Sequence, residues 1–315
     1  KQSLQQAVKK FKWKKSAPKI LKPNTDRALI ESLKNVFEAL YNQNGSLVLI
    51  IDEMGKYLEF CSDESQDLHL FQELAENFTR SKCASLLVGI LHQSFGDYSR
   101  KLDDQIRNNW MKVQGRYFDI PYSVAIDEVI YLLAEAISGR KTTTAEKKLC
   151  REVGTELKDA RLGSSKNLKS LADITQINYR YQRSARIDHD NSIENIQTFI
   201  VHETAKSTLK RILEDNGNQN TFTITGPYGG GKSSLALFLS ALFDENSKVQ
   251  SYARQQLEEF LDVKKSNVFN ASSNMVVKVV GQKSNPQEDL KQSLQQAVKK
   301  FKWKKSAPKI LKPNT

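Results

Sequence analysis

A short strand, a glycine-rich loop and an apolar helix follow one another at residues 221–243, which read TFTITGPYGGGKSSLALFLSALF. The loop fits the pattern G-x-x-x-x-G-K-[ST] at 226–233, and the flanking strand and helix are the context in which that pattern binds phosphate. Glycines let successive backbone N–H groups turn towards phosphate oxygens, and the N-terminus of the helix adds a favourable dipole. The stretch therefore predicts a phosphate-binding loop in an α/β fold.

The residues of this loop have separate expected roles. Lys232 supplies a positive charge to the β- and γ-phosphates of a nucleotide, and the Ser233 hydroxyl is a ligand for Mg²⁺. The other residues expected to contact the nucleotide are Gly226, Pro227, Tyr228, Gly229, Gly230, Gly231 and Ser234.

A second stretch, GSLVLIIDEMGKYLEF at 45–60, ends an apolar strand with two acids. Residues 47–51 are all apolar, as in a strand covered on both faces, and Asp52 and Glu53 follow at its carboxyl end, where open α/β sheets bind ligands. Two carboxylates there are costly without a cation. We expect Asp52 to hold Mg²⁺ and Glu53 to orient and activate water. The letters DEMG also fit the D-x-x-G element of GTPases, but the chain has no N-K-x-D motif, which favours ATP.

Together these motifs resemble those of P-loop ATPases of the additional-strand class, close to the AAA+ and STAND ATPases. The resemblance implies a doubly wound α/β core with a mainly parallel sheet, expected to have five strands, and a partial all-α appendage. It also implies ATP, Mg²⁺ and nucleoside triphosphate hydrolysis. In that class the phosphate loop precedes the acidic strand, whereas here Lys232 follows Asp52 by 180 residues.

The two ends of the chain account for this reversed order. Residues 1–25 and 291–315 are identical. The second copy continues a helix whose start signals lie just before it, namely Asn285, Pro286, Glu288 and Asp289, and the first copy lacks them. The first copy leads into a helix that Thr25 can cap, and the second copy lacks that helix. We expect the native chain to run from residue 315 directly on to residue 26, so that the printed sequence is a rotation of the native order. True tandem repetition or a deliberate permutation would give the same letters.

Closing this overlap restores the order of the class. Residues 177–290 would then be the first half of the ATPase core and residues 26–138 the second half. The identical segments 1–25 and 291–315 would be a basic, helix-rich seam between the halves, and 139–176 a polar helical linker or the start of a lid. Because no methionine opens the chain, we expect it to be a piece of a longer protein.

Two further site features come from the resemblance. It implies that the strand expected at 84–95 ends in a polar residue that senses the γ-phosphate. His92 is the candidate, with Gln93 and Ser94 as alternatives. It also implies an arginine just before the strand at 117–121 that reaches the γ-phosphate of a neighbouring subunit. Arg116 matches, with Arg107 and Arg100 as alternatives, and an ordinary surface arginine is as frequent an explanation. A role in a neighbouring site would require a homo-oligomer.

The net charge of +12 is local in origin. Each 25-residue copy contains eight lysines and no acid, so without one copy 40 basic residues face 36 acidic ones. Lysines alternate with Phe11 and Trp13 across 9–15, a composition typical of DNA or RNA binding. A solvated lysine face over two core aromatics is the commoner alternative.

The cysteines and the hydropathy indicate a cytoplasmic chain. Cys61, Cys83 and Cys150 are odd in number and lack metal-ligand spacing, as in a reducing compartment. No apolar run is long enough to span a membrane.

The stretches GPYGGGKSSLALFL, DEMGKYLEF and LHQSFGDY resemble ATPases of bacterial defence and mobile-element systems. The resemblance implies an ATP-hydrolysing module of a larger oligomeric machine, associated with nucleic acid or with defence. The alternative is a STAND-like signalling switch whose nucleotide state gates a separate effector. Hydrolysis stimulated by DNA would favour the first, and hydrolysis tied to a protein ligand the second.

Overall fold

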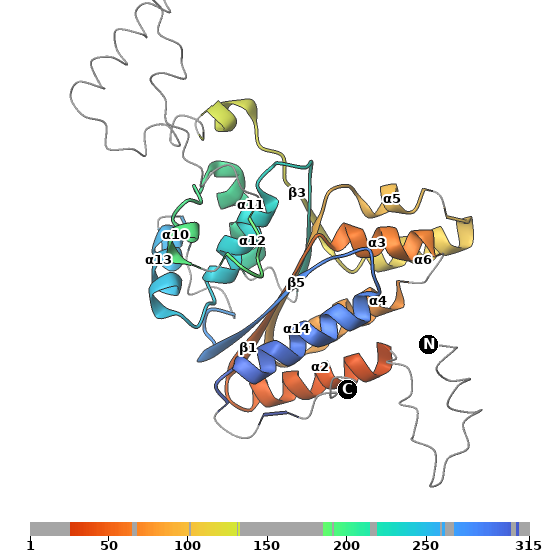
Figure 1. The fold of residues 1–315 in the computed structure, drawn as a ribbon, viewed down its shortest axis with the longest axis horizontal. Helices are drawn as coiled ribbons and strands as arrows, with labels where there is room; N and C mark the ends of the chain where they lie inside the picture. Colours follow the sequence, from red (N-terminus) through yellow and green to blue (C-terminus); the bar gives the residue numbers. More distant parts are fainter. Residues whose placement is uncertain are drawn as a thin grey trace, which may run out of the picture.

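The structure, a computed structural model, describes residues 26–64, 68–100, 102–130, 132, 185–190, 192–214, 219–258, 260–261, 268–303 and 307–308. Five parallel strands form one sheet across its centre (Figure 1). In sheet order they are β3 (Phe118–Pro121), β4 (Thr221–Thr225), β2 (Ala84–Leu91), β1 (Gly45–Asp52) and β5 (Ser273–Val280). Because β4 lies between β3 and β2, the two sequence halves interleave in a single sheet.

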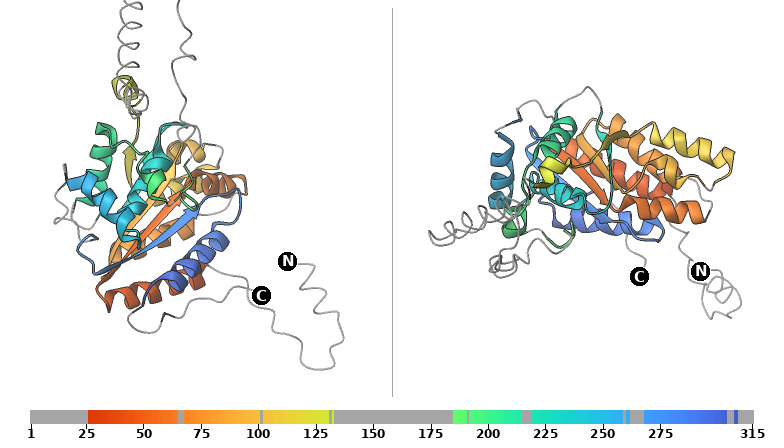
Figure 2. Two further views of the ribbon diagram at one scale, coloured as in Figure 1. Left: turned by 60° about the vertical axis from the view of Figure 1, so that its left-hand side comes forward. Right: turned by 90° about the horizontal axis from the view of Figure 1, so that it is seen from above.

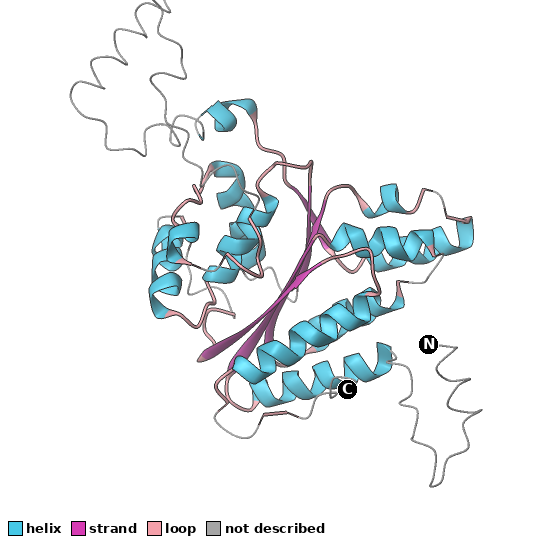
Figure 3. Ribbon diagram, in the orientation of Figure 1, coloured by secondary structure: helices cyan, strands magenta, loops and turns pink. Residues whose placement is uncertain are grey.

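Helices cover both faces of the sheet, which makes the fold a doubly wound α/β fold (Figure 3). All eight residues of β1 are buried, and their side chains alternate between two apolar clusters: Leu47 and Leu49 belong to one, Val48 and Ile50 to the other. The first cluster includes residues of α2 (Asp26–Tyr41), α3 (Met54–Asp63), α4 (His69–Arg80), α5 (Phe95–Tyr98), α6 (Asp104–Gln114) and α14 (Pro286–Lys300). The second includes residues of α10 (Ile193–Ile196), α11 (Glu203–Leu213), α12 (Lys232–Ala241) and α13 (Ser247–Glu258).

The helix that runs into the second copy of the repeated segment begins where the sequence predicts. The Asn285 side chain accepts a hydrogen bond from the Gln287 backbone N–H over 2.9 Å, and Pro286 opens α14. Helices α14 and α2 lie side by side on the same face (Figure 2), and the Gln287 side chain donates to Asp26. Since β5 and β1 are adjacent and parallel, a link from 315 to 26 would make an ordinary crossover between them. The rotated order stays a prediction, because residues 1–25 lie outside the described part.

The aromatic residues of the second copy belong to the core. Phe301 is buried, and Trp303 packs against the same cluster, with its Nε1 donating to the Val298 carbonyl over 2.9 Å. The two rings meet at a centroid distance of 4.8 Å. Their counterparts in the first copy are Phe11 and Trp13, which lie outside the described residues. Both described rings of the second copy pack on the core, and nothing among the described residues supports nucleic-acid binding through 9–15.

Over the ranges that the structure describes, no helix combines the length and apolarity needed to cross a membrane. Cys61 and Cys83 are buried. Cys150 and the expected linker or lid at 139–176 lie outside those ranges.

Candidate functional site

The glycine loop (residues 226–233) and the two acids of β1 lie at the same edge of the sheet. Strands β1 and β4 are parallel members of one sheet, with β2 between them, so their carboxyl ends share an edge. The Ser233 hydroxyl donates to Asp52 Oδ1 over 3.2 Å, although the two residues are 181 positions apart. The structure therefore brings together the two groups of residues that the sequence predicts to form a nucleotide site.

The glycine loop bends round the side chain of Lys232. Gly229 and Gly231 have φ angles of 77° and 83°, a left-handed conformation that glycine adopts without steric cost. The Lys232 ammonium donates to the carbonyls of Gly226 and Pro227 over 2.7 and 2.6 Å. Burial lowers the pKa of Lys232, and the nearby carboxylates of Glu53 and Asp52 oppose that shift. A positive charge is thus held inside the loop, at the start of α12.

Asp52 is a buried carboxylate with only 3% of its surface exposed. Its Oδ1 atom accepts both the Ser233 hydroxyl and the Glu53 backbone N–H, the latter over 2.9 Å. Burial raises the pKa of Asp52, against the opposing effect of these two hydrogen bonds. A cation beside Asp52 would relieve this cost.

The oxygens of Asp52 and Ser233 fit a magnesium ion that arrives with a nucleotide. Mg²⁺ in such sites takes one or two protein oxygens and completes its shell with phosphate oxygens and water. Among the described residues, no group of three or more His, Cys, Asp or Glu side chains could hold a metal unaided.

Glu53 turns the chain from β1 into α3 in a left-handed conformation, with φ at 54°. Gly281 packs against this turn: its N–H donates to the Asp52 carbonyl over 2.7 Å, and an added Cβ would lie 2.1 Å from the Glu53 carbonyl oxygen. The Glu53 carboxylate pairs with His92 Nε2 at 2.7 Å and Lys56 Nζ at 3.5 Å. Burial raises the pKa of Glu53, but His92 and Lys56 outweigh it and keep the pKa below its usual range. The group is ionised at neutral pH, as a base must be.

Of the three sensor candidates, His92 is the one that contacts the site. Its ring stacks on Tyr228 of the glycine loop, with centroids 3.5 Å apart. Gln93 is exposed, and Ser94 forms a reciprocal capping box with Asp97 at the start of α5. A sensing function for His92 stays a prediction.

A cavity of about 630 Å³ opens beside the glycine loop. Its size lies within the usual range for small-molecule sites. One side is formed by loop residues 227–231 and Ser234. The apolar lining residues include Val124, Val129, Leu132, Phe199, Ile200, Leu237 and Phe238. Such a wall suits a flat aromatic base.

Buried polar groups on the wall of this cavity were not predicted from the sequence. The Tyr122 hydroxyl and His202 Nε2 are 3.0 Å apart, and His202 Nδ1 lies 3.4 Å from the Glu128 carboxylate. Glu128 also accepts the backbone N–H of Thr204 over 2.8 Å. Tyr122 and His202 are 80 positions apart, so no local signal could have joined them.

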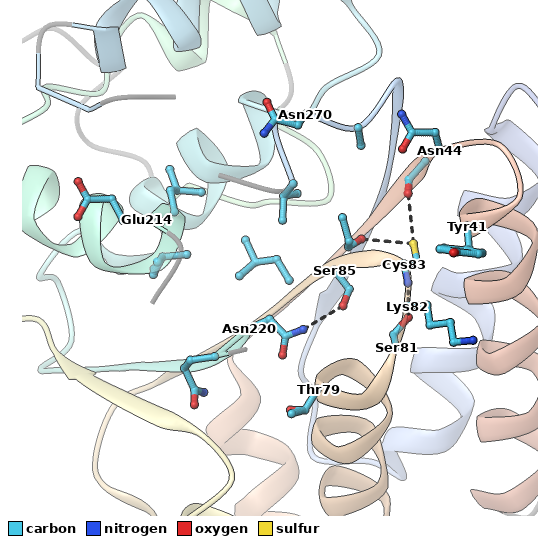
Figure 4. Close-up of a pocket in the computed structure, with 18 residues that line it drawn as sticks. Tyr41, Asn44, Thr79, Ser81, Lys82, Cys83, Ser85, Glu214, Asn220 and Asn270 are labelled. Atoms are coloured by element: carbon cyan, nitrogen blue, oxygen red, sulfur yellow. Dashed lines mark hydrogen bonds between the residues drawn. The ribbon is translucent and has the colours of Figure 1, made fainter. Parts of the chain in front are cut away.

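A second cavity, of about 520 Å³, lies at the opposite edge of the sheet, by the amino ends of the strands (Figure 4). Cys83 and the amides of Asn44, Asn220 and Asn270 line it, and no residue of 226–233 reaches it. Burial raises the pKa of the Cys83 thiol to about 12, so it is not a reactive thiolate at neutral pH. This cavity is separate from the candidate nucleotide site.

Arg116 also lies at the amino edge of the sheet, away from Asp52 and Lys232. It immediately precedes the β3 region, and its carbonyl accepts the hydroxyl of Thr221, the first residue of β4. Its guanidinium is paired with Glu76 through two contacts of 2.9 Å. The alternatives Arg100 and Arg107 pair with Asp97 and Asp104. The structure does not join Arg116 to the site of its own chain, so a role in a neighbouring subunit stays a prediction.

The chain was compared with protein-family models, with curated proteins and with solved structures. None of them matches it. A function for this site must therefore be argued from its geometry.

Proposed function

We propose that the chain is a Mg²⁺-dependent ATPase module. The observation that carries the proposal is the contact between Ser233 of the glycine loop and Asp52 of β1. This contact supports the proposal because it joins a residue expected to bind Mg²⁺ beside the phosphates to one expected to hold the ion, at the carboxyl edge of a parallel sheet, where such folds commonly bind ligands.

Each group then has a chemical task. Backbone N–H groups of the loop and the Lys232 ammonium bind the phosphates, and Ser233 and Asp52 hold the ion. When bound, Mg²⁺ neutralises charge that develops on the phosphate oxygens. Glu53 is ionised and is not one of the two residues that hold the ion, so it can orient the attacking water and accept its proton. Strand β2 lies between the loop strand and the acidic strand, which is the order expected of the additional-strand class and supports the proposal.

The apolar cavity beside the loop supports a nucleoside triphosphate as the ligand, because it can bury a base next to the phosphates. ATP is proposed over GTP because the chain lacks the guanine-reading motif. The wider assignment, to an oligomeric nucleic-acid or defence machine or to a STAND-like switch, rests on the sequence resemblance.

The test is phosphate release from ATP, with Mg²⁺ and with a chelator. We expect Lys232→Ala to abolish nucleotide binding, and Glu53→Gln to keep binding but stop hydrolysis. Lys210→Ala and Glu203→Gln are matched controls on exposed positions of α11, and both should behave as wild type. Wild-type turnover by Glu53→Gln would mean that another base acts.

A further inference from the structure

Tyr228 makes a contact that its place in the glycine loop does not require. The residue is 72% exposed, yet one face of its ring lies on the His92 ring, with an interplanar angle of 21° and centroids 3.5 Å apart. The loop requires glycine at 229 and 231, where φ is positive, but Tyr228 is not among the positive-φ residues. The conformation of the loop therefore does not explain the identity of the side chain at position 228.

The stack connects the loop to the proposed water-activating group. His92 Nε2 is bonded to Glu53 Oε2 over 2.7 Å. The other ring nitrogen of His92, Nδ1, is buried and has no hydrogen-bond partner among the described residues. The imidazole is thus held by the bond to Glu53 and the stack on Tyr228, with no hydrogen bond at Nδ1 to add to them among the described residues.

The backbone of Glu53 is fixed, so it cannot change the orientation of the carboxylate. Its turn is held by the close approach of Gly281, so the freedom that remains is that of the side chain. Lys56, the second partner of the carboxylate, lies 3.5 Å away on a side chain that is 42% exposed. His92 is the closer of the two partners, at 2.7 Å, and its side chain is only 11% exposed.

We propose that Tyr228 is a positioning residue that acts on Glu53 through His92, and so links the state of the glycine loop to the orientation of the water-activating carboxylate. This inference rests on the proposed ATPase function. A nucleotide that reshapes the loop moves Tyr228, and the stack transmits that movement to Glu53. The loop amides bind phosphate without the Tyr228 side chain, so its removal affects turnover and leaves affinity nearly unchanged.

The size of the effect is limited by the strength of the stack. An aromatic pair stabilises its geometry enough for a change of about three- to tenfold in rate. We expect Tyr228→Ala to lower kcat by about three- to tenfold while the dissociation constant for ATP stays within about twofold. Tyr228→Phe keeps the ring and should restore wild-type kcat. Tyr41→Ala, at an exposed tyrosine on α2, is the matched control and should change neither quantity.

Two further measurements separate positioning from a general structural effect. The chain has four histidines, so their ring protons can be resolved by NMR in the nucleotide-free protein. In Tyr228→Ala, but not in Tyr228→Phe, the His92 signals should lose the upfield shift caused by a stacked ring. In a double-mutant cycle, Tyr228→Ala should lower kcat no further once His92 is alanine.

The outcomes are distinct. If the wild type hydrolyses ATP and Tyr228→Ala does so at the wild-type rate or faster, the positioning role is refuted and the ATPase proposal stands. The positioning role is also refuted if the losses in the double-mutant cycle are additive, or if the His92 signals of Tyr228→Ala match those of the wild type. A wild type that neither binds nor hydrolyses ATP overturns both proposals.

Discussion

Gly281 directly follows β5, and Gly281→Ala perturbs Glu53 without changing any proposed site residue. An added Cβ would lie 2.1 Å from the Glu53 carbonyl oxygen and 2.8 Å from its carbonyl carbon. Contacts below 3.0 Å are not tolerated, so the two segments must separate by roughly 0.9 Å or more. Because both atoms of Glu53 belong to the backbone, no side-chain rotation can relieve the clash.

The cost follows from this displacement. Overpacking of this kind destabilises a fold by about 1–3 kcal/mol, and each kcal/mol lowers the melting temperature by about 2–4 °C in domains of about 150–250 residues. A displacement near 1 Å at a catalytic group can lower turnover by about 10²-fold. We therefore expect Gly281→Ala to melt several degrees lower and to lose at least about tenfold in kcat.

The assay compares thermal unfolding and phosphate release with those of Gly115→Ala. At Gly115, φ is −61° and the nearest atoms to an added Cβ are 3.7 Å away, so alanine fits there. This control should stay within about 0.5 kcal/mol of wild type. If Gly281→Ala matches the control in both measurements, the close approach of Gly281 to Glu53 is wrong.

Further predictions concern other parts of the chain. Burial lowers the pKa of His202 from its ordinary 6.5, so the unfolded chain takes up a proton that the folded chain resists, and stability should fall as pH drops through 6.5 until the folded pKa is passed. His202→Gln should flatten this fall in urea unfolding between pH 7 and 5, and parallel curves would contradict it. Arg116→Ala should leave ATP affinity nearly intact and lower turnover per subunit; mixing it with Lys232→Ala should restore activity if the arginine acts on a neighbour, and no recovery together with concentration-independent turnover would make it structural. Asn285→Ala should cost about 1 kcal/mol, because α14 loses its N-cap; a control at exposed Lys299 should not. A permuted chain running 173–315 and then 26–172 should form the same sheet with an equal or higher melting temperature, and failure to fold would refute the rotated order.

The sheet and the pairing of the two motifs could be predicted because they depend on local patterns and one general rule. The apolar run at 47–51 and the β-rich run at 221–225 are strands in the structure. Parallel strands place their carboxyl ends at one edge, so Asp52 and Ser233 were expected to meet. The α14 start could be predicted because a capping asparagine followed by proline acts within one turn.

Other features of the site depend on contacts between distant segments. That His92, and not Gln93 or Ser94, meets the site depends on where β2 ends, at Leu91, and on the turn that follows. The stack of Tyr228 on His92 and the approach of Gly281 to Glu53 require the assembled sheet. Arg116, just after α6, pairs with Glu76 of α4, and no local sequence pattern predicts this pairing. Proximity along the chain could not indicate these contacts.

The proposed function requires that the glycine loop and the acids of β1 form one site for a Mg²⁺-bound nucleoside triphosphate. Calorimetric titration of the nucleotide-free protein with ATP tests it most directly, with and without Mg²⁺ and with Lys232→Ala alongside. We predict saturable binding at one site per chain, weaker binding when Mg²⁺ is removed, and no binding to Lys232→Ala. Absence of binding to the wild type, or equal binding by a folded Lys232→Ala, would contradict the account.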